Sequence, residues 1–204
     1  MMKRVSFFAA LGVFVLGAAM VVSAVKVGDP APAFTATDDH GKSHKLSDFK
    51  GKFVVLEWHN QGCPYVRKHY NSGNMQKLQR EWTGKDVVWL TVISSAPGQQ
   101  GHVTPQQSQE FVKGQKAAAT AVLLDSSGEV GRAYDAVVSP HMFVINPDGV
   151  VIYNGAIDDK PTSNLADVET ATNYVSNALT EAMAGKPVTK TTSQPYGCGI
   201  KYAK

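Results

Sequence analysis

The segment that decides the fold is "FVVLEWHNQGCPYVRKHY", residues 53–70, in which an apolar run leads into a cysteine and a proline. The run at 53–58 is rich in β-branched residues and nearly all apolar, which is typical of a strand covered on both faces. Cys63 and Pro64 follow, and proline is favoured at the first position of a helix. The segment therefore predicts a buried strand, a short loop and a helix that begins beside Cys63.

The same alternation continues outward from this segment. Further strands are predicted at 86–94 and 121–125, and helices at about 63–82 with a break at 72–74, after Thr104-Pro105, and at 127–135. Residues 137–157 then indicate two strands joined by the turn Asn146-Pro147-Asp148-Gly149, and a long helix is predicted at 164–185. A short hairpin is predicted around 38–43.

This order of elements predicts the fold class. Strands that alternate with helices and end in a hairpin indicate an α/β sandwich with a central mixed β-sheet flanked by helices. We expect one domain at 25–185, followed by a polar C-terminal tail at 186–204 that carries Cys198 and shows no helical or strand period. Glycines on both sides of Cys198 would let this tail move toward Cys63.

The N-terminus has the pattern of a secretory signal. Lys3 and Arg4 precede an apolar run, and the small residues Val22-Ser23-Ala24 close it. The alternative is an uncleaved anchor, because the run at 5–22 is nearly long enough to span a bilayer. We favour a signal peptide at 1–24 that is cut after Ala24, which predicts an exported protein, periplasmic or secreted.

Charge and cysteine content narrow the function classes. The 204 residues hold 20 basic and 17 acidic side chains, and cleavage would remove the two basic residues Lys3 and Arg4. A balance of 18 to 17 gives no reason to expect nucleic acid or an acidic membrane surface as a partner. No other segment is apolar and long enough for a membrane span. Two cysteines in an exported chain are a candidate pair rather than a disulfide framework.

Several motifs in a fixed order then carry a family resemblance. With Cys63 after the first strand and Ser139-Pro140 before the hairpin, the chain resembles the thioredoxin fold. Its opening, "VGDPAPAFTATDDHGKSHKLSDFKGKFVVLEW", resembles the redoxin group, the alkyl hydroperoxide reductase and thiol-specific antioxidant family. The motifs "GCPYV", "NGAIDD", "AGKPV" and "YGCGIKY" are similar to a peroxiredoxin-like subgroup. The resemblance covers about residues 27–202 and implies a thioredoxin-like sandwich with no organic cofactor.

The resemblance also implies roles for residues around Cys63. Pro140 would be a cis-proline whose loop faces Cys63, with the backbone of Ser139 presented to whatever binds there. Together with Asn60, Pro64 and Tyr65, these two residues form the predicted substrate-binding set.

Cys63 is the predicted redox nucleophile. A thiol at a helix start lies among unpaired N–H groups that favour the thiolate, and Arg67, Lys68 and nearby histidines would add positive potential. Thiol-disulfide enzymes commonly carry a second cysteine three residues later, where this chain has Val66. An oxidised Cys63 must therefore be resolved by Cys198 or by another molecule.

The sequence departs from true peroxiredoxins at the nucleophile motif. Leu56 and Asn60 stand where that family has proline and the peroxide-binding threonine, although the Asn60 amide can donate a hydrogen bond. The predicted reaction is thiol-disulfide exchange, or reduction of a small peroxide with electrons from an external thiol. The partners would be a thiol reductant or a disulfide-bearing protein.

Two alternatives from other classes stay open. Cys63 and Cys198 can instead form a permanent structural disulfide in a protein without catalysis. His59, His69 and His141 can gather near Cys63 as a copper-binding module, although no metal-ligand spacing is present and we predict no metal site.

Overall fold

The computed structural model describes residues 25–204, so the predicted signal peptide lies outside the described residues. A five-stranded mixed sheet forms its centre, in the order β5-β4-β3-β7-β8. The strands are β3 (Val54–Trp58), β4 (Val88–Ile93), β5 (Ala121–Leu124), β7 (His141–Ile145) and β8 (Val151–Gly155). β3, β4 and β5 run parallel, whereas β7 is antiparallel to both β3 and β8. The predicted fold class, an α/β sandwich on a mixed sheet, is confirmed.

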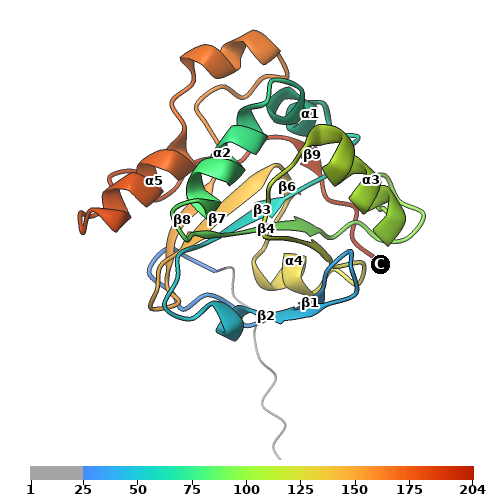
Figure 1. The fold of residues 1–204 in the computed structure, drawn as a ribbon, viewed down its shortest axis with the longest axis horizontal. Helices are drawn as coiled ribbons and strands as arrows, with labels where there is room; N and C mark the ends of the chain where they lie inside the picture. Colours follow the sequence, from blue (N-terminus) through green and yellow to red (C-terminus); the bar gives the residue numbers. More distant parts are fainter. Residues whose placement is uncertain (1–24) are drawn as a thin grey trace, which may run out of the picture.

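Helices and a hairpin cover the two faces of the sheet (Figure 1). The helices are α1 (Pro64–Asn71), α2 (Asn74–Thr83), α3 (Pro105–Gln115), α4 (Glu129–Ala133) and α5 (Tyr174–Met183), with 3₁₀ turns η1 (Leu46–Phe49) and η2 (Leu165–Thr170). The predicted hairpin is β1 (Thr35–Thr37) paired with β2 (Ser43–Lys45). In Figure 1, α1, α2 and α5 lie on one side of the sheet, and α4 lies with the hairpin on the other.

Alternation along β3 divides the interior into two cores. Val54, Leu56 and Trp58 pack in the core under α4 and the hairpin, whereas Val55 packs with Cys63 in the core under α1, α2 and α5. Successive side chains of a strand point to opposite faces, so one strand serves both cores. Cys63 therefore belongs to the face of the sheet that α1, α2 and α5 cover.

Two helix predictions have different outcomes. The break predicted at 72–74 is confirmed, because Gly73 takes a left-handed conformation (φ 76°) between α1 and α2. The single helix predicted at 164–185 is wrong, since η2 and α5 are separate there. Asn173 has an extended backbone, and its side chain accepts a hydrogen bond from the Ser176 amide, which begins a new helix.

The C-terminal tail was predicted without regular structure, and this is wrong at its cysteine. The strand β9 (Cys198–Gly199) pairs antiparallel with β6 (Val138–Ser139). The sequence "SQPYGCGIKY" gives no strand signal, because the strand is only two residues long, includes Gly199 and follows Gly197.

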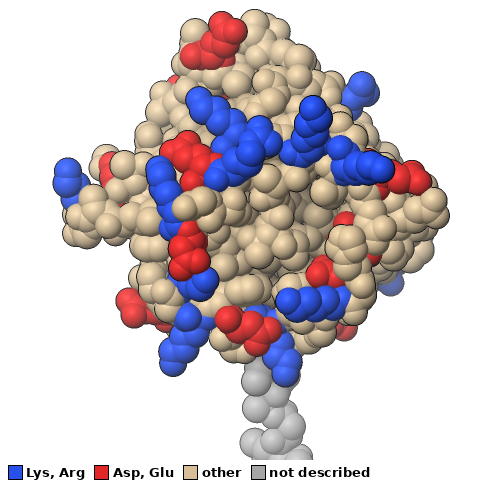
Figure 2. Space-filling model, in the orientation of Figure 1, with Lys and Arg blue, Asp and Glu red and all other residues tan. Residues whose placement is uncertain are grey.

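Charges of both signs are interspersed over the face drawn in Figure 2, in keeping with the near-neutral composition. Within residues 25–204, no helix combines the length and apolar character needed to cross the bilayer.

Candidate active site around Cys63 and Cys198

Cys63 is the residue immediately before α1, where the sequence predicted it. Its backbone is extended (φ −76°, ψ 125°), and its carbonyl oxygen accepts the hydrogen bond that starts the helix from the Arg67 amide, at 2.9 Å. Pro64 occupies the first helical position. The Cys63 side chain lies at the N-terminus of α1 and is 0% exposed.

The cis-proline loop lies against this sulfur. The Ser139–Pro140 peptide bond is cis, as the resemblance implied. The thiol of Cys63 donates to the carbonyl oxygen of Ser139 at 3.1 Å, so the backbone of Ser139 does face the cysteine. This contact places the Cys63 sulfur on the side of the Ser139 carbonyl.

Cys198 occupies that side. In the β6–β9 pair, Cys198 is directly opposite Ser139, whose carbonyl accepts from Cys63. Both cysteines are free thiols, and Cys198 is partly exposed. Burial, followed by the neighbouring Cys63 thiol, raises the pKa of Cys198 to about 12. Cys198 therefore holds its proton at neutral pH while it sits beside Cys63.

Gly197 is required for this approach. Its φ is 145°, and a Cβ added there would lie 1.9 Å from the carbonyl oxygen of Ser139. Only glycine lets the tail backbone come this close. Gly199 is different, because a Cβ added there would meet nothing nearer than 3.9 Å.

The tail is anchored on both sides of Cys198 by tyrosines. Tyr196 packs edge-on against Tyr65, with ring centroids 5.7 Å apart, and its hydroxyl enters a polar cluster below α1. Tyr202 lies on the two glycines of α4 and its N-cap, Gly131 and Gly128, and its hydroxyl donates to the Ala136 carbonyl at 2.6 Å. The predicted movable tail is thus docked in this structure.

The remaining predicted site residues surround the cysteine with different degrees of contact. Asn60 is buried, and both ends of its amide are engaged: its oxygen accepts from the Gly62 amide at 2.9 Å and its nitrogen donates to Gln100 at 3.1 Å. Pro64 is exposed and Tyr65 is half-buried. Asn60 therefore shapes the loop before Cys63, and Tyr65 contacts the tail.

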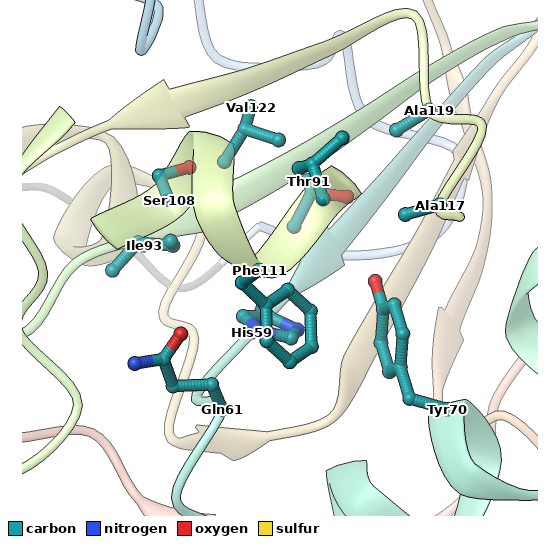
Figure 3. A pocket seen from close by; sticks show the side chains of 11 residues that line it. His59, Gln61, Tyr70, Thr91, Ile93, Ser108, Phe111, Ala117, Ala119 and Val122 are labelled. Carbon is teal, nitrogen blue, oxygen red and sulfur yellow. The ribbon is translucent and has the colours of Figure 1, made fainter. Parts of the chain in front are cut away.

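The three histidines do not gather. His69 lies on α1 beside Tyr196, and His141 begins β7 and binds Asn154 on the opposite face of the sheet. His59 lines a small cavity of about 30 Å³ with Tyr70 and Phe111 (Figure 3). Among residues 25–204, no group of three or more histidine, cysteine or carboxylate side chains is arranged to hold a metal ion. The grouping on which the copper alternative depended is wrong.

Comparisons with known proteins show the family of this chain. The AhpC/TSA family model matches residues 27–154, more than half of the chain. The chain belongs to the AhpC/TSA family. Thiol-disulfide oxidoreductase ResA of Bacillus thuringiensis is 30% identical over 128 residues, which cover 63% of this chain and 68% of that protein.

Solved structures share the fold of this AhpC/TSA family member. An uncharacterized conserved protein of Geobacillus kaustophilus aligns with a TM-score of 0.77 at 24% identity, over 87% of this chain and 93% of that one. The exposed lipoprotein thioredoxin of Streptococcus pneumoniae aligns with a TM-score of 0.51 at 25% identity, over 68% and 99%. The thioredoxin-like fold is confirmed, and the family and its relatives support the predicted class, a thiol-disulfide oxidoreductase.

Sequence reasoning missed several polar and aromatic residues that support the elements around this family member's site. Glu57 is fully buried on β3 and accepts hydrogen bonds from Tyr70 (2.8 Å) and Trp89 (2.8 Å). An acidic residue inside the apolar run "FVVLEW" was the available signal. Tyr196 and Tyr202 were also missed, although aromatic residues on both sides of a cysteine in a polar tail could have indicated docking.

Proposed function

We propose that this protein is an exported thiol-disulfide oxidoreductase in which Cys63 is the nucleophile and Cys198 the resolving thiol. The observation that carries the proposal is the register of β6 and β9, which puts Cys198 opposite the residue that binds the Cys63 thiol. Cys63 stands at the N-terminus of α1, whereas burial and the neighbouring Cys63 thiol raise the pKa of Cys198. The two sulfurs are therefore suited to different steps.

The proposed reaction has two exchange steps. The Cys63 thiolate attacks one sulfur of a substrate disulfide, which forms a mixed disulfide and expels the other substrate sulfur as a thiolate. Cys198 then loses its proton and attacks the Cys63 sulfur, which releases the second substrate thiolate and leaves a Cys63–Cys198 disulfide. The substrate gains two electrons, the cysteine pair loses them, and an external thiol reductant restores the pair.

Access to Cys63 requires the tail to move. The Cys63 side chain is 0% exposed beneath the cis-proline loop and β9. A disulfide-bearing protein or a small disulfide can reach the sulfur only after β9 separates from β6. The predicted binding set, Asn60, Pro64, Tyr65, Ser139 and Pro140, would then line the opened site.

Peroxide reduction has weaker support. The Asn60 amide stands near the family threonine position but already binds Gly62 and Gln100. A peroxide held there would have to replace these bonds. The proposed substrate class is therefore a disulfide rather than a peroxide.

Export is proposed from two observations. Residues 1–24 have the composition of a signal peptide, and one structural relative is described as an exposed lipoprotein. Export places the cysteine pair where disulfides persist.

A permanent Cys63–Cys198 disulfide is the second candidate function, favoured by the docking of the tail on both sides of Cys198.

Redox titration separates the two functions. Residues 25–204 would be equilibrated in glutathione buffers, and free thiols would be trapped and counted. A potential above about −250 mV supports exchange, and one below about −300 mV supports a structural bond. With oxidised glutathione, Cys198→Ser should accumulate a mixed disulfide at Cys63, whereas Cys63→Ser should form none. Equal labelling of both variants would overturn the division of roles.

A further inference from the structure

A buried polar cluster joins α1 to the tail next to the cysteine pair. Lys68 and His69 on α1 are 0% exposed, and Asp158, in the loop after β8, is 2% exposed. The Lys68 ammonium lies 3.6 Å from one carboxylate oxygen of Asp158. Buried charges are costly unless they are paired and hydrogen-bonded, so this cluster depends on every partner that it has.

The hydroxyl of Tyr196, a residue of the tail, completes the cluster. It donates to one oxygen of Asp158, and its own oxygen accepts from Lys68 at 3.2 Å and from His69 at 3.3 Å. Asn74 donates to the other ring nitrogen of His69 at 2.9 Å, which leaves Nε2 as the donor toward Tyr196. All the hydrogen-bonding capacity of the Tyr196 hydroxyl is used.

Departure of the tail would leave these groups short of partners. The second carboxylate oxygen of Asp158 already has no hydrogen bond in the described structure. The Lys68 ammonium would keep one hydrogen bond, to the Lys160 carbonyl at 2.7 Å. Loss of partners at buried charged groups is unfavourable, so the cluster favours the docked tail.

The position of Tyr196 connects this cluster to the chemistry. Tyr196 and Cys198 are separated only by Gly197, so they are about 7 Å apart at most along the chain. Cys198 in turn pairs with Ser139, whose carbonyl accepts from the Cys63 thiol. An anchor two residues away fixes both the register and the direction of approach of Cys198.

We propose that Tyr196, held by the buried Lys68–Asp158 pair and His69, is a positioning residue that presents Cys198 to Cys63. This rests on the proposed function, in which Cys198 resolves an oxidised Cys63. Tyr196 does not touch the reacting sulfurs in this role. By holding β9, Tyr196 raises the effective concentration of the Cys198 thiol at Cys63.

The test compares Tyr196→Phe with the matched control Tyr174→Phe, which removes a hydroxyl from α5 outside the cluster. The equilibrium constant of the Cys63–Cys198 disulfide is measured against glutathione. Tyr196→Phe should lower it about tenfold, which equals a rise of about 30 mV in the potential of this two-electron couple. The control should stay within twofold of the parent protein.

A second measurement does not need the disulfide. In the Cys198→Ser background, trypsin cleavage at the exposed Lys201, beyond β9, reports release of the tail. Tyr196→Phe should accelerate this cleavage at least fivefold, with no change for Tyr174→Phe. Unchanged potential and unchanged cleavage would overturn the positioning role alone. A parent protein that never forms the Cys63–Cys198 bond would overturn the proposed function instead.

Discussion

Cys63 and Cys198 lie side by side, but the fold holds them in different ways. Cys63 stands between β3 and α1, and its loop, helix and cis-proline neighbour belong to regular elements of the domain. Cys198 stands in a tail whose strand is two residues long. Its place depends on a close backbone approach at Gly197 and on two tyrosine anchors. One thiol is therefore fixed by the domain and the other by docking.

This difference suggests how the pair can work. A fixed sulfur keeps its environment through a catalytic cycle, whereas a docked strand can leave and return without unfolding the domain. Variants that weaken the docking should change the behaviour of Cys198 while the sheet and α1 stay folded. The following changes test this contrast.

Gly197→Ala should have the largest effect on docking. A Cβ would clash with the Ser139 carbonyl, at 1.9 Å, and φ is 145°. We expect at least about 3 kcal/mol against docking, or about a hundredfold fall in the equilibrium constant of the Cys63–Cys198 disulfide. Redox titration against glutathione measures this equilibrium constant.

Gly199→Ala is the control for this change, because its Cβ would make only ordinary contacts at 3.9 Å. It should leave the equilibrium constant within about threefold. Equal losses in both variants would show that the contact at Ser139 does not hold the tail. A loss of the folded domain in Gly197→Ala would show that the tail is part of the domain's core.

Tyr202→Ala should weaken the second anchor. The half-buried ring packs on Gly128 and Gly131, and the variant loses this contact and the bond to Ala136. We expect the docking of the tail to weaken by about 2 kcal/mol, which lowers the equilibrium constant of the Cys63–Cys198 disulfide roughly thirtyfold. Tyr202→Phe keeps the ring, so the equilibrium constant of the disulfide should fall only about fivefold. If the phenylalanine variant lost as much as the alanine variant, the hydroxyl rather than the packing would hold the tail.

Stability should fall with acid because of His69. Burial, followed by repulsion from Lys68, lowers the pKa of His69 to about 3 in the folded protein, against 6.5 unfolded. Between these values the unfolded chain binds more protons, so stability present above pH 6.5 is lost as the pH falls toward 3. From pH 7 to pH 5 this amounts to about 2 kcal/mol.

Urea unfolding of the parent protein and His69→Gln at both pH values checks this expectation. The variant should be less stable at pH 7 but should lose about 2 kcal/mol less on acidification. His141→Gln is a useful comparison on the other face of the sheet, since burial also lowers the pKa of His141, to about 4. An acid response identical to the parent in His69→Gln would contradict a neutral, buried His69.

Tyr65→Ala should have the smallest effect. The ring of Tyr65 meets Tyr196 edge-on at 5.7 Å, and such aromatic pairs contribute about 0.5–1.5 kcal/mol. We expect the disulfide equilibrium to fall about threefold to tenfold, less than for the Tyr202→Ala anchor variant. A larger loss would mean that Tyr65, beside the nucleophile, is the main support of the tail.

The sequence by itself determined the backbone elements that carry the site. The apolar run at 53–58, the pair Cys63-Pro64 and the turn at 146–149 predicted the strand, the helix start and the hairpin, because each rests on local backbone preference or periodicity. Family motifs added the cis-proline at Pro140. These features depend on residues close to one another in the chain.

Only the tertiary structure decided the rest. The buried Lys68–Asp158 pair and the docking of Tyr196 and Tyr202 join residues far apart in the chain. No period marks a two-residue strand such as β9, since its pairing partner at 138–139 supplies most of its order. The second thiol was visible in the sequence, but its place opposite Ser139 follows from packing against the folded domain.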